Sequence, residues 1–195
     1  MILIGYSGHA FVVAHTAGQI GYSLTGYMDK AEKEDNPYNL KYLGSERAEE
    51  GLNKLKNRPY FVSIGDNETR QKVQHFVIEE TGRPPERLLH PLATLAKKVE
   101  LGQGTLVSAG VVIQPLATIG EGTIINTGAI IEHECKVGAF SHVAPGAVLA
   151  GNVSIGDRSF VGANAVIIED LDIGSDVTIG AGAVIINDIP DGVTV

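Results

Sequence analysis

The second half of the sequence carries a six-residue repeat. A branched apolar residue occupies every sixth position from Leu89 to Ile185, which makes 17 consecutive positions without a slip. Four residues after each of them comes a second residue, usually a small one, from Ala93 to Ile189. Neither the 3.6-residue helical period nor the two-residue strand period produces such rows, so the repeat itself is the main structural signal.

A flat face closed by a tight corner explains one six-residue unit. Three faces make a triangular coil of about 18 residues, and coils stack at roughly the 4.8 Å spacing of neighbouring strands. We therefore predict a left-handed parallel β-helix over residues 89–195, with five to six coils and a height of about 25–30 Å. Cys135, the only cysteine, falls on the small inward row, where we expect plain packing rather than thiol chemistry.

Residues 1–88 follow a different pattern, in which strands alternate with helices. Apolar strand candidates lie at 1–4, 22–28, 60–64 and 87–89. Helical patterns follow Gly8 and end at Gly21, run from Ser45 as N-cap to Asn57, and cover 68–81. This alternation predicts an α/β domain with a small Rossmann-like parallel sheet.

Charge and composition narrow the possible functions. A net charge of −8 argues against general nucleic-acid binding. No apolar run reaches 18 residues, and the start of the chain does not resemble a signal peptide, so we expect no membrane span. A single cysteine, which excludes an internal disulfide, favours a cytoplasmic protein. The histidines also lack ligand partners at metal-binding spacing, and we expect no metal.

Three loops leave the carboxyl ends of the expected strands, where parallel sheets bind their ligands. They carry Gly5, Ser7, Gly8 and His9, then Asp29 and Lys30, then Gly65, Asn67 and Arg70. The first loop opens a helix, whose N–H groups favour phosphate, but it lacks the full dinucleotide fingerprint. We interpret the loops as a mononucleotide site; the alternative is that the glycines only turn the chain. His15 and His75 lie inside helices and are interpreted as structural.

The faces of the β-helix require a partner. Outward positions include Ile124, Ile130, Val148 and Val166. A ring of three is a common closed solution to such contacts, so we expect a homotrimer. Long clefts between neighbouring β-helices would suit a long, flexible cofactor such as coenzyme A.

Two histidines interrupt the corner pattern of the repeat. His133 is flanked by Glu134, and His142 follows nine residues later, which the phase of the repeat predicts to be the same neighbourhood. A neutral imidazole can remove a proton from an amine or hydroxyl, and a carboxylate can orient it, provided that the chain turns between them. The alternative is two histidines on a solvated face. Asn126 could bind a substrate amine or simply form a corner.

Three motifs together resemble one branch of the hexapeptide-repeat acyltransferases. They are Ile4–His9, Ile64–Arg70 and Ile125–Glu134. The branch contains the PglD-type nucleotide-4-amino-sugar N-acetyltransferases and the sialic-acid O-acetyltransferases, and the similarity covers essentially the whole chain. It departs from the family pattern at Asp191–Val195, where members continue with a short tail that helps to hold CoA. Either the tail is absent or the sequence is truncated before it; the difference concerns the adenine end of the CoA site and not the chemistry expected at His133.

The resemblance assigns roles to individual residues. A UDP-linked amino sugar would be bound at Gly5, Ser7, Gly8, His9, Asp29, Lys30 and Gly65, with Asn126 near the sugar amine. His133 matches the general base and Glu134 its supporting carboxylate. The acetyl-CoA groove would be lined by His142, Gly151, Ala163 and Ala181.

The resemblance thus implies an acetyl-CoA-dependent N-acetyltransferase acting on a UDP-linked 4-amino-4,6-dideoxy sugar. Glu134 and His142, which the O-acetylating members often lack, favour N-acetylation. The alternatives are O-acetylation of sialic acid or another sugar hydroxyl, and a non-catalytic trimer that binds a nucleotide sugar or CoA.

Overall fold

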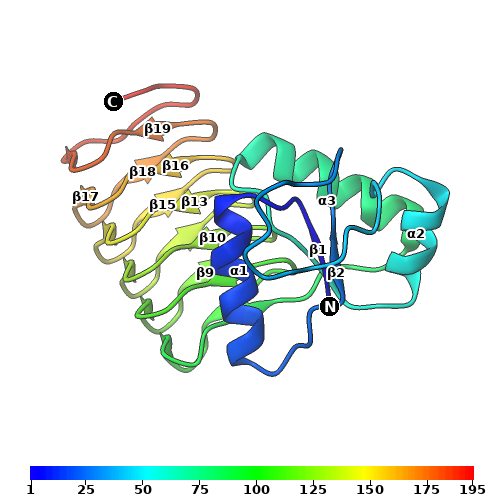
Figure 1. Ribbon diagram of the computed structural model, residues 1–195. Coiled ribbons are helices and arrows are strands. Elements are labelled where there is room, and N and C mark those ends of the chain that lie inside the picture. Colours follow the sequence, from blue (N-terminus) through cyan, green and yellow to red (C-terminus); the bar gives the residue numbers. More distant parts are fainter.

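The computed structural model describes residues 1–195 as an α/β part beside a β-helix (Figure 1). The α/β part contains β1 (Ile2–Ile4), α1 (Gly8–Gln19), β2 (Gly26–Met28), α2 (Glu49–Lys56), β3 (Tyr60–Val62) and α3 (Asn67–Thr81). Its three parallel strands lie in the order β2-β1-β3. The small parallel sheet expected from the sequence is therefore present.

The two faces of this sheet bury alternate strand residues. Leu3, Tyr27 and Phe61 pack with α1, whereas Ile2 and Ile4 pack on the opposite side with α2 and α3. As a result α1 lies between the sheet and the β-helix, while α2 and α3 cover the far face (Figure 1). None of the three helices is long and apolar enough to cross a membrane.

Two of the expected element boundaries are wrong. The helix α2 begins at Glu49 with Ala48 as N-cap, because Ser45 instead closes a preceding turn, in which its hydroxyl accepts the N–H of Arg47. The strand expected over 22–28 is reduced to β2, since only Gly26–Met28 pairs with β1. Gly21, with φ +86°, follows the end of α1 as expected.

The β-helix consists of short strands, each two residues long. They are β4 (Leu88–Leu89), β5 (Thr94–Leu95), β6 (Glu100–Leu101), β7 (Leu106–Val107), β8 (Val112–Ile113), β9 (Thr118–Ile119), β10 (Ile124–Ile125), β11 (Ile130–Ile131), β12 (Lys136–Val137), β13 (His142–Val143), β14 (Val148–Leu149), β15 (Ser154–Ile155), β16 (Phe160–Val161), β17 (Val166–Ile167), β18 (Asp172–Ile173), β19 (Thr178–Ile179) and β20 (Val184–Ile185).

These strands form the three faces of a left-handed prism. The first sheet has the order β19-β16-β13-β10-β7-β4, the second β20-β17-β14-β11-β8-β5 and the third β18-β15-β12-β9-β6. Residues paired between these strands lie 18 positions apart, as Ile124 and His142 do, whereas the isolated bridges from Ile173 to Ile189 and from Thr178 to Thr194 span 16 positions. Both sequence rows point inward and form one core, in which Cys135 is fully buried. The predicted architecture is thereby confirmed.

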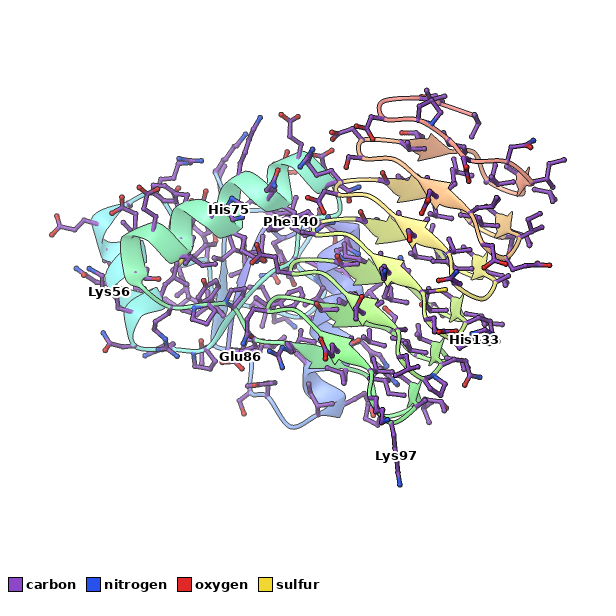
Figure 2. All side chains as sticks on the ribbon, turned by 180° about the vertical axis from the view of Figure 1, so that it is seen from behind. Lys56, His75, Glu86, Lys97, His133 and Phe140 are labelled. Atoms are coloured by element: carbon purple, nitrogen blue, oxygen red, sulfur yellow. The ribbon has the colours of Figure 1, made fainter.

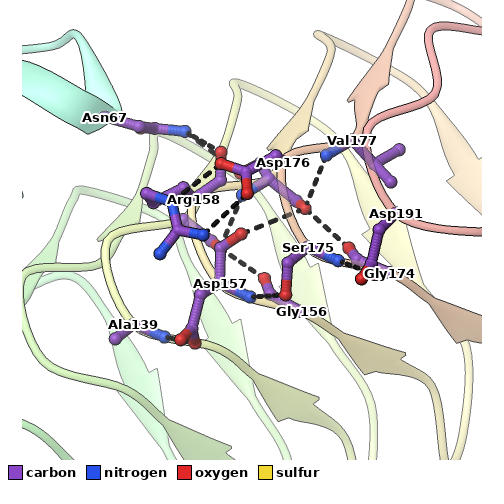
Figure 3. A network of polar contacts seen from close by, with 12 residues as sticks. Asn67, Ala139, Gly156, Asp157, Arg158, Gly174, Ser175, Asp176, Val177 and Asp191 are labelled. Atoms are coloured by element: carbon purple, nitrogen blue, oxygen red, sulfur yellow. Dashed lines mark hydrogen bonds and ion pairs between the residues drawn. The ribbon is translucent and has the colours of Figure 1, made fainter.

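Side chains of one coil cap the backbone of the coil before it at the corner between the third and first sheets (Figure 3). Asp157 accepts the N–H of Ala139 at 2.7 Å, and Asp191 accepts the N–H of Ser175 at 2.8 Å. Ser175 in turn accepts the N–H of Asp157. Corner amides that the short strands leave unpaired are satisfied in this way.

Each outer face of the prism has a distinct character. Leu88, Leu106 and Ile124 of the first sheet are buried against the α/β part. The expectation that Ile124 faces another subunit is therefore wrong, since its own chain covers it. The outward column of the second sheet is apolar: Val112, Ile130, Val148, Val166 and Val184. The corresponding column of the third sheet is polar: Glu100, Thr118, Lys136, Ser154 and Asp172.

Candidate functional site

His133 and Glu134 lie at the corner between the second and third sheets. Nδ1 of His133 lies 3.1 Å from Oε2 of Glu134, although neighbouring residues on a straight strand would point apart. The chain turns here because Glu134 adopts a left-handed conformation, with φ +63°. Both side chains are exposed, at 59% and 56%. The carboxylate therefore orients the imidazole with the proton on Nδ1, which leaves Nε2 free as a base.

The next coil places Gly151 directly against the His133 ring. A Cβ at Gly151 would lie 2.6 Å from Cε1 and 2.8 Å from Nε2 of the imidazole. The backbone N–H of Gly151 donates no hydrogen bond within the chain. A cleft of about 390 Å³ opens here, lined by His133, Glu134, Ala150, Gly151, Asn152, Glu169 and Asp170. The unprotonated ring nitrogen of His133 thus lies beside a backbone N–H that has no partner within the chain.

His142 lies on the first sheet and faces the α/β part. Its ring centroid is 6.1 Å from that of His9, and the edge of Phe160 packs on it at 5.2 Å. Nε2 of His142 lies 3.1 Å from Nδ2 of Asn126. Because Oδ1 of Asn126 accepts the N–H of Thr127, its amide nitrogen is the group that faces the ring and donates to it. Nε2 is therefore an acceptor, and the ring proton is on Nδ1.

Burial keeps both of these histidines neutral. Burial, followed by the charges of Arg70 and His9, lowers the pKa of His142 from 6.5 to about 3. Burial and Arg70 likewise lower the pKa of His9 to about 4. Nε2 of His9 is buried without a hydrogen-bond partner in the chain. The His142 imidazole is thus neutral and fixed in position, and it is suited to forming hydrogen bonds rather than to acting as a base.

A single chain does not bring His133 and His142 together. His133 occupies the corner opposite the first sheet, on the edge remote from α3 and Phe140 (Figure 2). His142 points from the first sheet into the junction with the α/β part. The expectation of one shared neighbourhood is wrong within a chain, because half a coil moves the side chain to another face of the prism. The chain instead presents two separate half-sites, one at the His133 corner and one at the His142 face of the first sheet.

The start of α1 forms an open cleft of about 290 Å³. Its lining consists of Tyr6, Ser7, Gly8, Phe11, Lys33, Glu34 and Asp35. The Ser7 side chain makes no capping bond, and no atom lies within 4 Å of where a Cβ of Gly8 would be. The first N–H groups of the helix are therefore accessible to an anion, with the Lys33 ammonium on the same cleft.

The Asp29 carboxylate is already bound by other groups of its own chain. It accepts the N–H groups of Tyr6 and Lys30 and pairs with Lys33 at 3.3 Å. It shapes the first loop and holds the lysine at the cleft. Lys30 itself is exposed. Gly5 adopts φ +85° against Ile64, which suits a turn rather than a ligand contact.

The three residues predicted for the third loop, Gly65, Asn67 and Arg70, have different surroundings. Gly65 packs near His9, where an added Cβ would lie 3.7 Å from the histidine Cβ. Asn67 donates to the carbonyl of Arg158 in the β-helix. Arg70 lies within α3 and is 1% exposed, so its interpretation as a ligand-facing loop residue is wrong.

The remaining predicted groove residues lie on another corner. Ala163 and Ala181 stack in successive coils between the first and second sheets, where the carbonyl of Ala163 accepts the N–H of Gly182. They are separated from Gly151, which lies between the second and third sheets. Within the chain, no group of three acidic, histidine or cysteine side chains is placed to hold a metal ion.

Two site residues were not anticipated from the sequence. Lys33 lies in a polar segment without periodicity, and only its spacing from Asp29 gives a signal. Phe160 repeats the position of His142 one coil later, so the 18-residue register could have identified it.

Comparison with known families matches both parts. The PglD N-terminal domain matches residues 1–77, and the bacterial transferase hexapeptide repeat matches residues 152–187. Comparison with curated proteins finds no significant match.

Solved structures resemble the whole chain. A histidine-to-alanine variant of GDP-perosamine N-acetyltransferase from Caulobacter crescentus, in complex with CoA and GDP-perosamine, is 35% identical, with a TM-score of 0.92 over 99% of this chain and 91% of that one. The acetyltransferase domain of PglB from Neisseria gonorrhoeae, in complex with acetyl coenzyme A, is 34% identical, with a TM-score of 0.90 over 99% and 93%. WeeI from Acinetobacter baumannii shares the fold at 24% identity, with a TM-score of 0.85 over 99% and 94%. The chain therefore belongs to the PglD-type family of left-handed β-helix sugar acetyltransferases.

Proposed function

We propose that the protein transfers an acetyl group from acetyl-CoA to the amine of a nucleoside-diphosphate-linked 4-amino-4,6-dideoxy sugar. The observation that carries the proposal is the His133–Glu134 pair, with a free Nε2 beside the unpaired N–H of Gly151. The similar Caulobacter and Neisseria proteins, which bind GDP-perosamine with CoA and acetyl coenzyme A respectively, support both substrates.

The two half-sites complete each other in a homotrimer. The apolar column of the second sheet, where Val166 is 36% and Val184 is 64% exposed, is the face left for another copy. Packing of that kind would bring the His133 corner of one chain toward the His142 face of its neighbour. CoA would then lie between two β-helices, touching Gly151 of one chain and Ala163 and Ala181 of the other.

The nucleotide occupies the cleft at the start of α1. Its phosphates meet the helix N-terminus at Ser7 and Gly8, near the Lys33 ammonium. The base lies toward Phe11 and the acidic segment that contains Glu34. The sugar extends toward His9 and Asn126, and His142 lies where the sugar amine meets the acetyl group of acetyl-CoA.

Each step of the transfer has a group to perform it. Nε2 of His133 takes a proton from the 4-amine as the amine nitrogen attacks the thioester carbonyl, and Glu134 stabilises the resulting imidazolium. The N–H of Gly151 stabilises the oxyanion of the tetrahedral intermediate. Collapse of that intermediate breaks the C–S bond, and the CoA thiolate leaves as the acetamide forms.

Mass spectrometry of reactions with acetyl-CoA tests the proposal. We expect a gain of one acetyl group on UDP- or GDP-linked 4-amino sugars, and the comparison of the two identifies the base. The product should resist mild alkali, because an amide does and an ester does not. His133→Asn should lower kcat by about 10²–10⁴-fold. An alkali-labile product would indicate O-acetylation, and binding without transfer would indicate a non-catalytic protein.

A further inference from the structure

Arg70 is a fully buried cation in the junction between the two parts of the chain. Its side chain leaves α3 and is 1% exposed, yet it makes no ion pair within 4 Å. Burial lowers the pKa of its guanidinium to about 9, so the group still carries a charge at neutral pH. A buried charge without a carboxylate is costly unless other groups satisfy it.

Three of its acceptors belong to the α/β part. Nη1 donates to the carbonyls of Ile64 and Gly65, at 3.0 and 2.8 Å. Nη2 donates to Oδ1 of Asn67 at 2.7 Å. These bonds fix the loop that joins β3 to α3.

Three further acceptors belong to two successive coils of the β-helix. Nε donates to the carbonyl of Gly122 at 2.6 Å, and Nη2 donates to Phe140 at 2.7 Å and, more weakly, to Ser141 at 3.3 Å. The Phe140 ring occupies the space beside Gly122, where a Cβ would lie 2.3 Å from it. A planar guanidinium fork can join the α/β part to two coils at once, with Nη2 sharing its two hydrogens among three acceptors, whereas a lysine ammonium cannot reach them all.

These contacts lie on both sides of His142. Ser141 precedes it on the β-helix, and the carbonyl of Gly65 lies beside its ring, where it favours the protonated form of the imidazole. That carbonyl is the acceptor available to the Nδ1 proton, which the Asn126 contact assigns. Arg70 therefore holds both the histidine's strand and its hydrogen-bond acceptor.

We infer that Arg70 is a positioning residue. By joining the Gly65 loop to the corners at Gly122 and Phe140, it sets the distance between the Gly65 carbonyl and the His142 ring, and with it the tautomer of that ring. At 1% exposure its side chain is not accessible to a substrate. Without the fork, the Gly65 carbonyl and the His142 strand would move independently, and the ring would lose its single orientation. The kinetic consequences rest on the proposed function; the state of the ring does not.

Ring-nitrogen NMR of histidine-labelled protein tests the inference. The His142 signals are identified as those missing in His142→Gln. In the native protein we expect one neutral tautomer with the proton on Nδ1. In Arg70→Lys, which keeps the charge but loses the fork, we expect averaged tautomers. We also expect a fall in kcat/KM for the nucleotide sugar of about 10²-fold, with the dissociation constant of acetyl-CoA changed less than twofold.

Lys72→Met is the matched control, since Lys72 is exposed on the same helix and contacts only Glu68. Unchanged His142 signals and kinetics in folded Arg70→Lys would overturn the inference. If Arg70→Lys does not fold, Asn67→Ala leaves the arginine but removes one of its acceptors, together with the Asn67 bond to the Arg158 carbonyl. The same His142 signals should then shift by a smaller amount, and no shift would equally overturn it. Should the protein transfer no acetyl group at all, the NMR result alone decides.

Discussion

The Cα of Gly151 lies so close to the His133 ring that no side chain fits between them, because a Cβ would come within 2.6 Å of Cε1. Gly151→Ala should therefore displace the imidazole while leaving the prism intact. Since a misplacement of about 1 Å can cost on the order of 10²-fold in rate, we expect a fall in kcat of that size. The thermal midpoint should change little, as the ring is exposed and can move outward.

Gly18→Ala provides the control for this substitution. No atom lies within 4 Å of the added methyl, and the residue lies in α1 without a positive φ. Its kcat should match that of the native protein. Native turnover in Gly151→Ala would show that the position of the His133 ring is not critical.

The left-handed backbone at Glu134 permits a clean test of the carboxylate. Asparagine tolerates this conformation, and Asn152 adopts it at the equivalent corner of the next coil, with φ +58°. Glu134→Asn should keep the turn but remove the charge that stabilises the imidazolium. We expect kcat at saturating substrates to fall by about tenfold or more, because the imidazolium formed during transfer loses its anionic partner.

Native turnover in Glu134→Asn would argue against the carboxylate's role. Asp170→Asn, which removes a carboxylate two coils further along the same edge and keeps the left-handed corner, controls for charge at this edge. Values of kcat measured for both variants at saturating substrates would separate the two effects.

Much of the prism could be predicted because the same contacts, between residues 18 positions apart, repeat along the β-helix. From Leu89 to Ile185 each branched residue is buried by the residues 18 positions away, so the local pattern and the tertiary contacts carry the same information. The loops around Asp29 and Lys33 have no such periodicity. Their arrangement depends on single hydrogen bonds, such as that from the Tyr6 N–H to Asp29, which the sequence does not reveal.

The pairing of His133 with Glu134 was predicted correctly, but the placement of the other candidate site residues was not. The His133–Glu134 pair was identifiable because the repeat places a corner there. The separation of His133 from His142 follows from which face the α/β part covers, and Arg70 was misplaced because a charged residue near a ligand loop ordinarily faces solvent. Both are tertiary properties that a local pattern does not contain.

The neutral histidines in the junction should make stability depend on pH. Their pKa values in the folded chain, about 3 for His142 and about 4 for His9, lie below the ordinary 6.5. The unfolded chain therefore takes up protons first, so this stability is complete above about pH 6.5 and declines as the pH falls. Each group should remove on the order of 1 kcal/mol per pH unit between pH 6.5 and 5.

Urea unfolding at pH 7.0, 6.0 and 5.0 measures this dependence. The double variant His9→Gln/His142→Gln should show a flatter decline in the free energy of unfolding over that range. His15→Gln, at an exposed position on α1, should decline as steeply as the native protein. Equal slopes in all three proteins would mean that the junction histidines titrate normally.

The division of the site between chains predicts that two inactive variants should restore each other. His133→Asn and His142→Gln remove different half-sites, which lie on separate faces of one chain. If neighbouring copies complete the site, co-refolded trimers from an equal mixture should contain about one quarter of sites with both native halves, and activity should return to about that level. Simple mixing without subunit exchange should restore nothing, and recovery should vanish if Val148→Lys disrupts the apolar column. Failure of properly mixed trimers to recover activity would place the whole reaction within one chain.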